Sequence, residues 1–147
     1  MKAYLDLVQH VLANGIRREN RTGIDTLMSF GYHYKVNLQN GFPILTTKKV
    51  FFNSVVRELL WYLSGETHIR NLRKHTKIWD AWTSEEKKWE IGKMYGYQWV
   101  KWDKYTKDND TSQIKHSHIN QIQEVIDLIH KNPNSRRMVV TAWNPTV

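Results

Sequence analysis

The sequence contains no cysteine among its 147 residues. It can therefore form neither a disulfide framework nor a thiolate metal site. No apolar stretch approaches the roughly 18 residues that a membrane span requires. The first residues form an amphipathic pattern in place of a signal peptide. We therefore expect a cytoplasmic chain without a membrane partner.

Phosphate loops, linkers and repeats are also missing. No Gly-rich phosphate loop occurs, which argues against a nucleoside triphosphatase, and no Gly/Ser or Pro-rich linker divides the chain. The seven histidines do not predict a metal site. His116 and His118 are too close together for one helical face, and no carboxylate has the spacing to complete a ligand set. We expect no metal.

What the sequence does contain is typical of a folded protein. Hydrophobic residues make up 40% of the chain, with seven Trp and seven Tyr. The length fits one compact domain or a portion of a larger one, since domains commonly have roughly 100–200 residues. A net charge of +8 and a pI near 9.7 attract nucleic acids, nucleotides and acidic cofactors alike.

Apolar periodicity predicts three helices, over residues 4–12, 54–63 and 119–129. Ser54 is a plausible N-cap of the second helix, and Gly65 can close it. Asn132-Pro133 stops the third helix.

Two segments predict strands. Residues 30–38 alternate apolar and polar side chains, and residues 138–143 form an apolar run. The polar segment 103–118 is typical of a surface loop or insertion. Because helices and strands mix without regular alternation, we expect an α+β fold with a mixed sheet covered by the helices that begin at Ser54 and Ile119.

Arg136 and Arg137 open the apolar run. Guanidinium groups are planar, permanently charged and bidentate, so two neighbours could neutralise a phosphomonoester. An exposed basic turn is the alternative. Arg21-Thr22-Gly23 is a second candidate phosphate loop, with an ordinary turn as its alternative.

Glu58 interrupts the strongly apolar second helix, one turn before Tyr62. A carboxylate partly removed from water is suited to moving protons through ordered water near neutral pH. An ion pair with Arg57 on a solvated helix edge is equally compatible with this segment.

Aromatic residues cluster at 78–82 and 94–99. Such clusters usually fill a core, but Trp and Tyr also offer flat faces on which a base or a pteridine can stack. Thr46-Thr47-Lys48-Lys49 adds a basic patch that could meet a carboxylate-rich tail or simply face solvent.

Together these motifs resemble thymidylate synthase. They occur in the order and approximate spacing seen in that family, from the first helix to the last residue. The matching segments are Arg21-Thr22-Gly23, Gly41-Phe42-Pro43, Thr46-Thr47-Lys48, Glu58-Leu59-Leu60-Trp61, Ile78-Trp79-Asp80, Tyr95-Gly96, Gln98-Trp99, Ser135-Arg136-Arg137 and Ala142-Trp143-Asn144. The chain looks like the N-terminal portion, residues 1–147, of a single domain of this family, and we expect its sheet to be incomplete.

The resemblance implies a methyltransferase that converts dUMP to dTMP, with 5,10-methylenetetrahydrofolate donating the carbon and the hydride. In this family a cysteine thiolate attacks the pyrimidine. The family's cysteine lies beyond the segment around Asn144, so we expect a truncated and inactive piece.

The resemblance also implies the substrate contacts. Arg21 corresponds to a phosphate ligand, and Arg136 with Arg137 to the pair donated across a homodimer to the neighbour's dUMP. Asn144 corresponds to a residue near the approach to the active site.

The remaining correspondences concern catalysis and folate. Glu58 matches the carboxylate that relays protons, and Tyr95 a tyrosine of the water network near the reacting carbon. Trp79 and Trp82 correspond to walls of the folate site. Lys48 is expected to hold the glutamate tail of folate. Phe51 or Phe52 stands where many members have a folate-binding histidine, which leaves that contact open.

Three alternatives remain. Deoxycytidylate hydroxymethylases share the fold and these motifs. From another class, the positive charge and stacking aromatics could serve a non-catalytic fragment that binds single-stranded nucleic acid. The third is a truncated product without catalysis that acts only as a dimerisation or regulatory partner.

Overall fold

The computed structural model describes residues 2–145. The chain divides into two compact units, an N-terminal unit, Met1–Phe51, and a C-terminal unit, Phe52–Val147. Both units combine helices with short antiparallel strand pairs, so the predicted α+β class is confirmed. The expectation that the whole chain is part of one domain stays a prediction.

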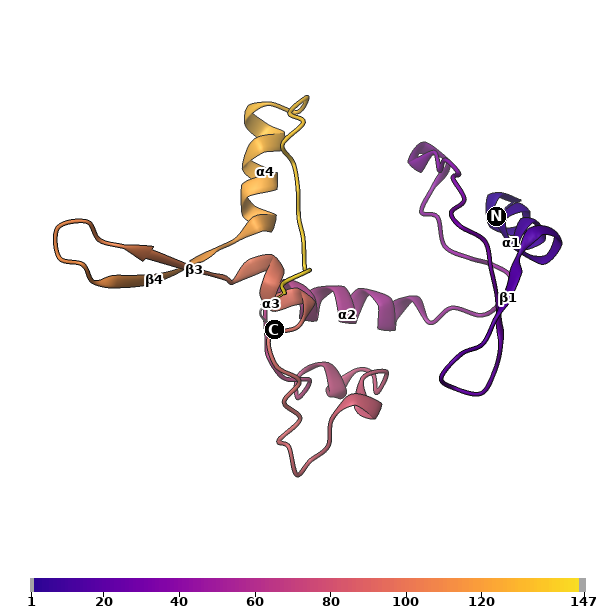
Figure 1. The fold of residues 1–147 in the computed structure, drawn as a ribbon, viewed down its shortest axis with the longest axis horizontal. Helices are drawn as coiled ribbons and strands as arrows, with labels where there is room; N and C mark the ends of the chain where they lie inside the picture. Colours follow the sequence, from indigo (N-terminus) through magenta and orange to yellow (C-terminus); the bar gives the residue numbers. More distant parts are fainter. Residues whose placement is uncertain (1, 146–147) are drawn as a thin grey trace. The chain divides into compact units, whose positions relative to one another are not determined.

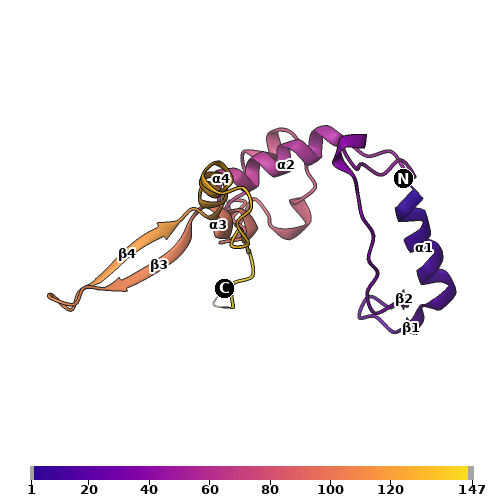
Figure 2. The same cartoon turned by 90° about the horizontal axis from the view of Figure 1, so that it is seen from above.

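The N-terminal unit is a helix followed by a hairpin (Figure 2). Helix α1 (Lys2–Asn14) leads into β1 (Ile16–Arg18), which pairs antiparallel with β2 (Thr26–Met28). His10 joins the helix to the chain after β2, because its Nε2 lies 3.1 Å from the Ser29 hydroxyl and its ring contacts Tyr32. The predicted first helix is confirmed.

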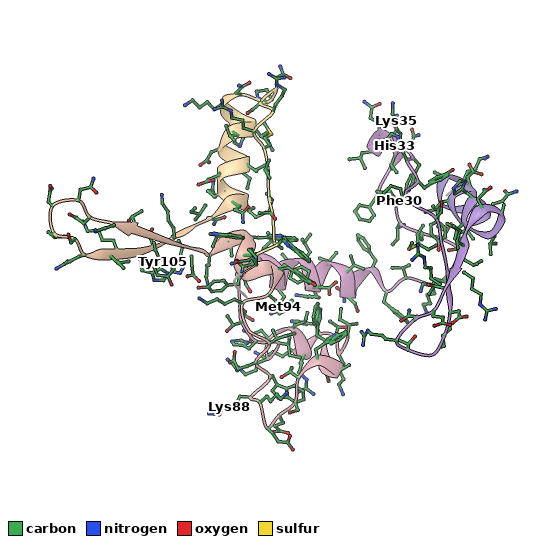
Figure 3. The ribbon with its side chains drawn as sticks, viewed as in Figure 1. Phe30, His33, Lys35, Lys88, Met94 and Tyr105 are labelled. Carbon is green, nitrogen blue, oxygen red and sulfur yellow. The ribbon has the colours of Figure 1, made fainter. Side chains whose placement is uncertain are left out.

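The predicted strand over residues 30–38 is wrong. This segment carries no strand, and it leads into a short 3-10 helix, η1 (Leu38–Asn40). Phe30, the first of the alternating apolar residues, is fully exposed at 101% and projects from the chain (Figure 3). Alternation produces a strand only where a partner edge is available, and the β1–β2 pair does not extend to this segment.

The described part of the C-terminal unit, residues 52–145, contains three α-helices and one hairpin, which can be followed in Figure 1. In chain order its elements are α2 (Phe52–Ser64), η2 (Leu72–Lys74), η3 (Asp80–Trp82), α3 (Tyr95–Val100), β3 (Trp102–Lys107), β4 (Ile114–Ile119) and α4 (Gln121–Lys131). Helix α2 packs on α3, and α3 also contacts β3 and α4. Short α3 is therefore the element that joins the others.

Two predicted helices are confirmed with corrected starts. Helix α2 begins at Phe52, so Ser54 lies inside the first turn and is not the N-cap. Its end is as expected, because Gly65 adopts a positive φ of 63°. Helix α4 begins after Asn120, whose side chain accepts a hydrogen bond from the Gln123 amide, whereas Ile119 ends the preceding strand.

The polar segment 103–118 is a hairpin, not a loop. Strands β3 and β4 pair antiparallel in a register that sets Asp103 opposite His118 and Tyr105 opposite His116. Asp108 organises the turn by accepting hydrogen bonds from the amides of Asp110 and Thr111.

The predicted strand over residues 138–143 is also wrong. The segment runs alongside α4 in both ribbon views (Figures 1 and 2) but pairs with no strand among the described residues. Gln121 holds it instead: its Oε1 accepts from the Thr141 amide and its Nε2 donates to the Thr141 carbonyl, both at 2.9 Å. The sheets described are therefore two separate hairpins, and no helix-covered mixed sheet unites them.

The buried core lies in the C-terminal unit. Among residues 2–145 the buried apolar side chains are Trp61, Ile69 and Leu72, and Tyr62, Trp79, Trp89 and Ile91 pack around them. Many other large apolar side chains are exposed, including Trp143 at 85%. Within the same described range, every helix falls short of the length and hydropathy that a bilayer crossing requires.

Candidate functional site

The site begins where α2 and α3 meet. Gly96 lies so close to α2 that an added Cβ would be 2.3 Å from the Tyr62 carbonyl oxygen. This close approach places the Tyr62 ring edge-on to two α3 rings, at 6.0 Å from Tyr95 and 5.4 Å from Trp99 between centroids. The glycine therefore sets the spacing between the helix that carries Glu58 and the helix that carries Tyr95.

Glu58 is held by two aromatic donors. The Trp79 indole Nε1 donates to its Oε1 at 2.6 Å, and the Tyr62 hydroxyl donates to the same oxygen at 3.5 Å. The side chain is half-buried, and none of the ion pairs among residues 2–145 includes Glu58 or Arg57. The structure thus favours a Glu58 carboxylate that two hydrogen bonds hold in place over one that forms an ion pair with Arg57 at the helix edge.

The phenol of Tyr62 is protonated across the physiological range. Burial, then the nearby charge of Glu58 and the neighbouring Tyr95, raise the pKa of Tyr62 to about 12. The hydroxyl is consequently a permanent donor toward Glu58. The indole N–H of Trp79 can likewise only donate. Glu58 is therefore the hydrogen-bond acceptor for both aromatic side chains.

Trp79 and Trp82 lie next to this carboxylate. Their rings are 6.3 Å apart between centroids, and Trp79 also contacts the buried Trp61 at 5.6 Å. Trp82 is 67% exposed, so much of its flat surface is open to a ligand. Trp79 is therefore both a core residue and a partner of Glu58, whereas Trp82 is available for stacking.

A cavity of about 540 Å³ opens beside the start of α3. Tyr95 and Asn144 line it together with Ile91, Gly92, Lys93, Met94, Ala142, Trp143 and Pro145. Met94, at the start of α3, is labelled in Figure 3. The volume is in the range of small-molecule sites. The structure thus brings two predicted site residues, 49 positions apart in the chain, to one cavity.

Two glutamines that position Asn144 were not singled out from the sequence. Gln98 is 2% exposed, and its Oε1 accepts a hydrogen bond from Asn144 Nδ2 at 3.1 Å. Gln121 donates to the main-chain oxygen of Gln98 at 2.7 Å while it holds Thr141. Gln98 lies in a predicted motif, but no sequence signal marks Gln121.

Arg136 and Arg137 follow α4 in a turn in which the Ser135 hydroxyl accepts from the Arg137 amide at 3.2 Å. Both side chains are exposed, and within residues 2–145 neither takes part in an ion pair. Their guanidinium groups are accessible to an anion. The interpretation as an ordinary basic turn also fits this geometry.

The other predicted contacts belong to the N-terminal unit. Arg21 is exposed in a turn that Gly23 completes with a φ of 75°. Lys48 is exposed, and the Phe51 ring lies 5.3 Å from the Lys49 ammonium. Convergence of these residues with those of the C-terminal unit stays a prediction.

The β3–β4 hairpin carries a polar cluster that the sequence interpretation missed. Asp103 Oδ1 lies 2.8 Å from His116 Nε2 and 3.4 Å from His118 Nε2. Hydrogen bonds from Lys93 and then His116 lower the pKa of Asp103 to about 2. His116 and His118 lie on a strand, not on a helix. On paired strands, alternate residues share a face, and a carboxylate on the facing strand joins them.

A comparison with protein families gives a match over nearly the whole chain. The model of the family described as thymidylate synthase matches residues 2–147. The match therefore extends through both units and includes every candidate site residue discussed above.

Proposed function

This chain belongs to the thymidylate synthase family of methyltransferases in dTMP biosynthesis, and we propose that it serves the reductive methylation of dUMP to dTMP. The observation that carries the proposal is the carboxylate of Glu58, which accepts from Trp79 and Tyr62 close to Tyr95. The carboxylate can hold and move a proton, and Tyr95, whose ring packs edge-on against Tyr62, lines a cavity of ligand size.

The aromatic residues fit the co-substrate. When bound, 5,10-methylenetetrahydrofolate supplies the one-carbon unit and the hydride. A pteridine is flat and carries N–H groups, so the exposed face of Trp82 offers stacking and Glu58 offers a hydrogen-bond acceptor. In this proposal Trp79 fixes the carboxylate, Trp82 covers the ring, and Lys48 and Phe51 contact the rest of the folate.

Glu58 is the proposed proton-transfer group. Its Oε1 is occupied by the two aromatic donors. The second oxygen, Oε2, is then the atom that would exchange a proton with ordered water or with a substrate. Tyr95, which is 46% exposed and lines the cavity, would complete the water network near the reacting carbon.

Phosphate binding is assigned to arginine. Arg136 and Arg137 are adjacent and exposed. In this proposal they reach across a homodimer to the phosphate of the neighbour's dUMP. Arg21 is the proposed third ligand, and Asn144 lines the cavity from the end of the segment that Gln121 holds.

The sulfur nucleophile of this reaction is not among these 147 residues, because they include no cysteine. Turnover therefore requires a thiolate from outside this sequence, and ligand binding is the direct test of the residues present. Binding of dUMP can be followed by isothermal titration calorimetry.

We expect Arg136→Ala to weaken dUMP binding by about 10- to 100-fold, since a hydrogen bond between charged groups contributes about 1.5–3 kcal/mol. Lys131→Ala is the matched control: it removes the same charge from an exposed position at the end of α4. Deoxyuridine, which lacks the phosphate, should bind both variants equally.

Equal affinities of Arg136→Ala and Lys131→Ala for dUMP would remove the phosphate assignment. Tighter binding of dCMP than of dUMP would point to a hydroxymethylase. Preference for a short single-stranded oligonucleotide, with affinity that falls steeply with salt, would favour the nucleic-acid alternative.

A further inference from the structure

One face of the β3–β4 hairpin carries the polar cluster. The register sets Asp103 opposite His118 and Tyr105 opposite His116, and residues two apart on a strand point the same way. All four side chains therefore share a face. The hairpin projects from α3 in both ribbon views (Figures 1 and 2), and Tyr105 marks this cluster in Figure 3. None of these residues is part of the proposed methyltransferase site.

Three of these side chains offer ligand atoms that converge. Both histidine Nε2 atoms approach the same oxygen, Asp103 Oδ1, and one ligand atom from each of the three residues lies within 4.8 Å of the others. Around a tetrahedral ion with bonds of about 2.0–2.2 Å, neighbouring ligand atoms are roughly 3.3–3.6 Å apart. Small side-chain rotations would therefore bring the three atoms to metal-binding distances.

Aromatic contacts hold the two imidazoles in place. The Tyr105 ring stacks on His116 with 4.8 Å between centroids and 16° between planes. Tyr97 packs edge-on against His118, and its hydroxyl lies 3.3 Å from Asp103 Oδ1 and 3.4 Å from His118 Nε2. Outer contacts of this kind fix ligand orientation in metal sites.

We propose that Asp103, His116 and His118 form a binding site for Zn²⁺ or a similar first-row divalent ion. Two imidazoles and one carboxylate are typical ligands for zinc, copper or nickel, whereas Mg²⁺ and Ca²⁺ prefer oxygen ligands throughout. Three protein ligands leave a coordination position for water. The bound ion would replace the direct Asp103–histidine contacts and tie β3 to β4.

Lys93 opposes the cation. Its ammonium lies 2.5 Å from Asp103 Oδ2, so it shares the carboxylate with the ion, although the oxygen that faces the histidines is the other one. The ligand side chains are 19%, 45% and 44% exposed for Asp103, His116 and His118, which leaves room for entry and for water ligands. Repulsion by Lys93 predicts that neutralising it strengthens binding.

Titration of the 147-residue chain with ZnCl₂ by calorimetry tests the site. We expect one equivalent to bind. His116→Gln and His118→Gln should each weaken binding at least about tenfold, since loss of a ligand costs no less than loss of an outer contact. Lys93→Gln should tighten it. His130→Gln, which changes an exposed histidine at the end of α4, is the matched control and should bind like the parent chain.

Cobalt gives a second, structural readout. Co²⁺ bound by these ligands should show visible d–d absorption that the His116→Gln/His118→Gln double variant loses while its far-UV circular dichroism is unchanged. The proposal is overturned if the double variant retains the parent's zinc stoichiometry and affinity. It is equally overturned if His130→Gln weakens binding as much as the hairpin variants do, or if the parent chain binds no zinc.

Discussion

Gly96→Ala tests whether the contact between α2 and α3 organises the candidate site. The added Cβ would lie 2.3, 2.6 and 2.8 Å from the oxygen, Cα and carbonyl carbon of Tyr62. All three are main-chain atoms of α2, so no side-chain rotation relieves the overlap. The helices would have to separate by about 1 Å to restore an ordinary contact.

The magnitude follows from two opposing effects. Overpacking of a fixed contact costs about 1–3 kcal/mol, and rigid backbone favours the upper half of that range. Alanine recovers up to about 1 kcal/mol because it is the better helix former. We therefore expect Gly96→Ala to lower the free energy of unfolding by about 1–2 kcal/mol, which corresponds to roughly 4–16 °C in Tm for a unit of this size.

Tryptophan fluorescence during urea unfolding is the assay. All seven tryptophans of the sequence lie in the C-terminal unit, so the signal reports on that unit. Gly92→Asn is the control, because an added Cβ there meets nothing within 4 Å and asparagine tolerates the left-handed φ of 82°. If Gly96→Ala is as stable as the parent chain, or no less stable than Gly92→Asn, the close approach of α3 to Tyr62 is refuted.

Two further predictions concern pH and the buried amide. Because the pKa of Tyr62 is raised from 10.0 to about 12, its contribution to stability is complete below pH 10 and is lost as the pH rises toward 12. Glu58→Gln removes one cause of the raised pKa, so less stability should be lost between pH 10 and pH 12 in alkaline unfolding monitored by fluorescence, and an undiminished loss would contradict this role of Glu58. Gln98→Leu removes a hydrogen-bond acceptor of Asn144 and should lower the free energy of unfolding, measured in urea, by about 1–3 kcal/mol. Gln123→Leu, on the exposed surface of α4, is the control and should change it little. Equal effects of the two substitutions would contradict the role of the buried Gln98 amide.

The helices could be predicted because their signals are local. The apolar periodicity and terminal signals of α1, α2 and α4 lie within each segment, so these helices differ from expectation by one or two residues at their ends. Short α3 was not predicted, because its residues belong to an aromatic cluster without a helical apolar face. Ser54 illustrates the limit. A good capping residue is not a cap when the chain already turns into the helix two residues earlier.

Strands could not be predicted equally well because they depend on distant partners. Residues 30–38 have the alternation of a strand but no neighbour to pair with, whereas the polar segment 103–118 pairs with itself through the turn at Asp108. Polar residues occupy both faces of this exposed hairpin, so its sequence has no apolar alternation from which the two strands could be predicted. The ligands of the proposed metal site were missed for the same reason, since their convergence depends on strand register.

The candidate site was partly predictable. Glu58 and Tyr62 are one helical turn apart, so their contact follows from the helix, but the stronger donor, Trp79, comes from 21 positions further along. Gln121 carries no chemical signal in the sequence at all. Its role depends on a hydrogen-bonding match with Thr141 that only the folded chain displays.

Because Gln121 holds Thr141, insertions before Thr141 and insertions after it should have different effects on the position of Asn144. The amide side chain of Gln121 hydrogen-bonds the main-chain N–H and C=O of Thr141, as a neighbouring strand would in a sheet, and it holds only this one residue of the segment. Insertions or deletions in the exposed stretch before Thr141 can be absorbed without displacing Asn144 from its cavity. Between Thr141 and Asn144, by contrast, adding even one residue would carry Asn144 away from Gln98. The number of residues between these two positions therefore determines whether Asn144 reaches the cavity wall.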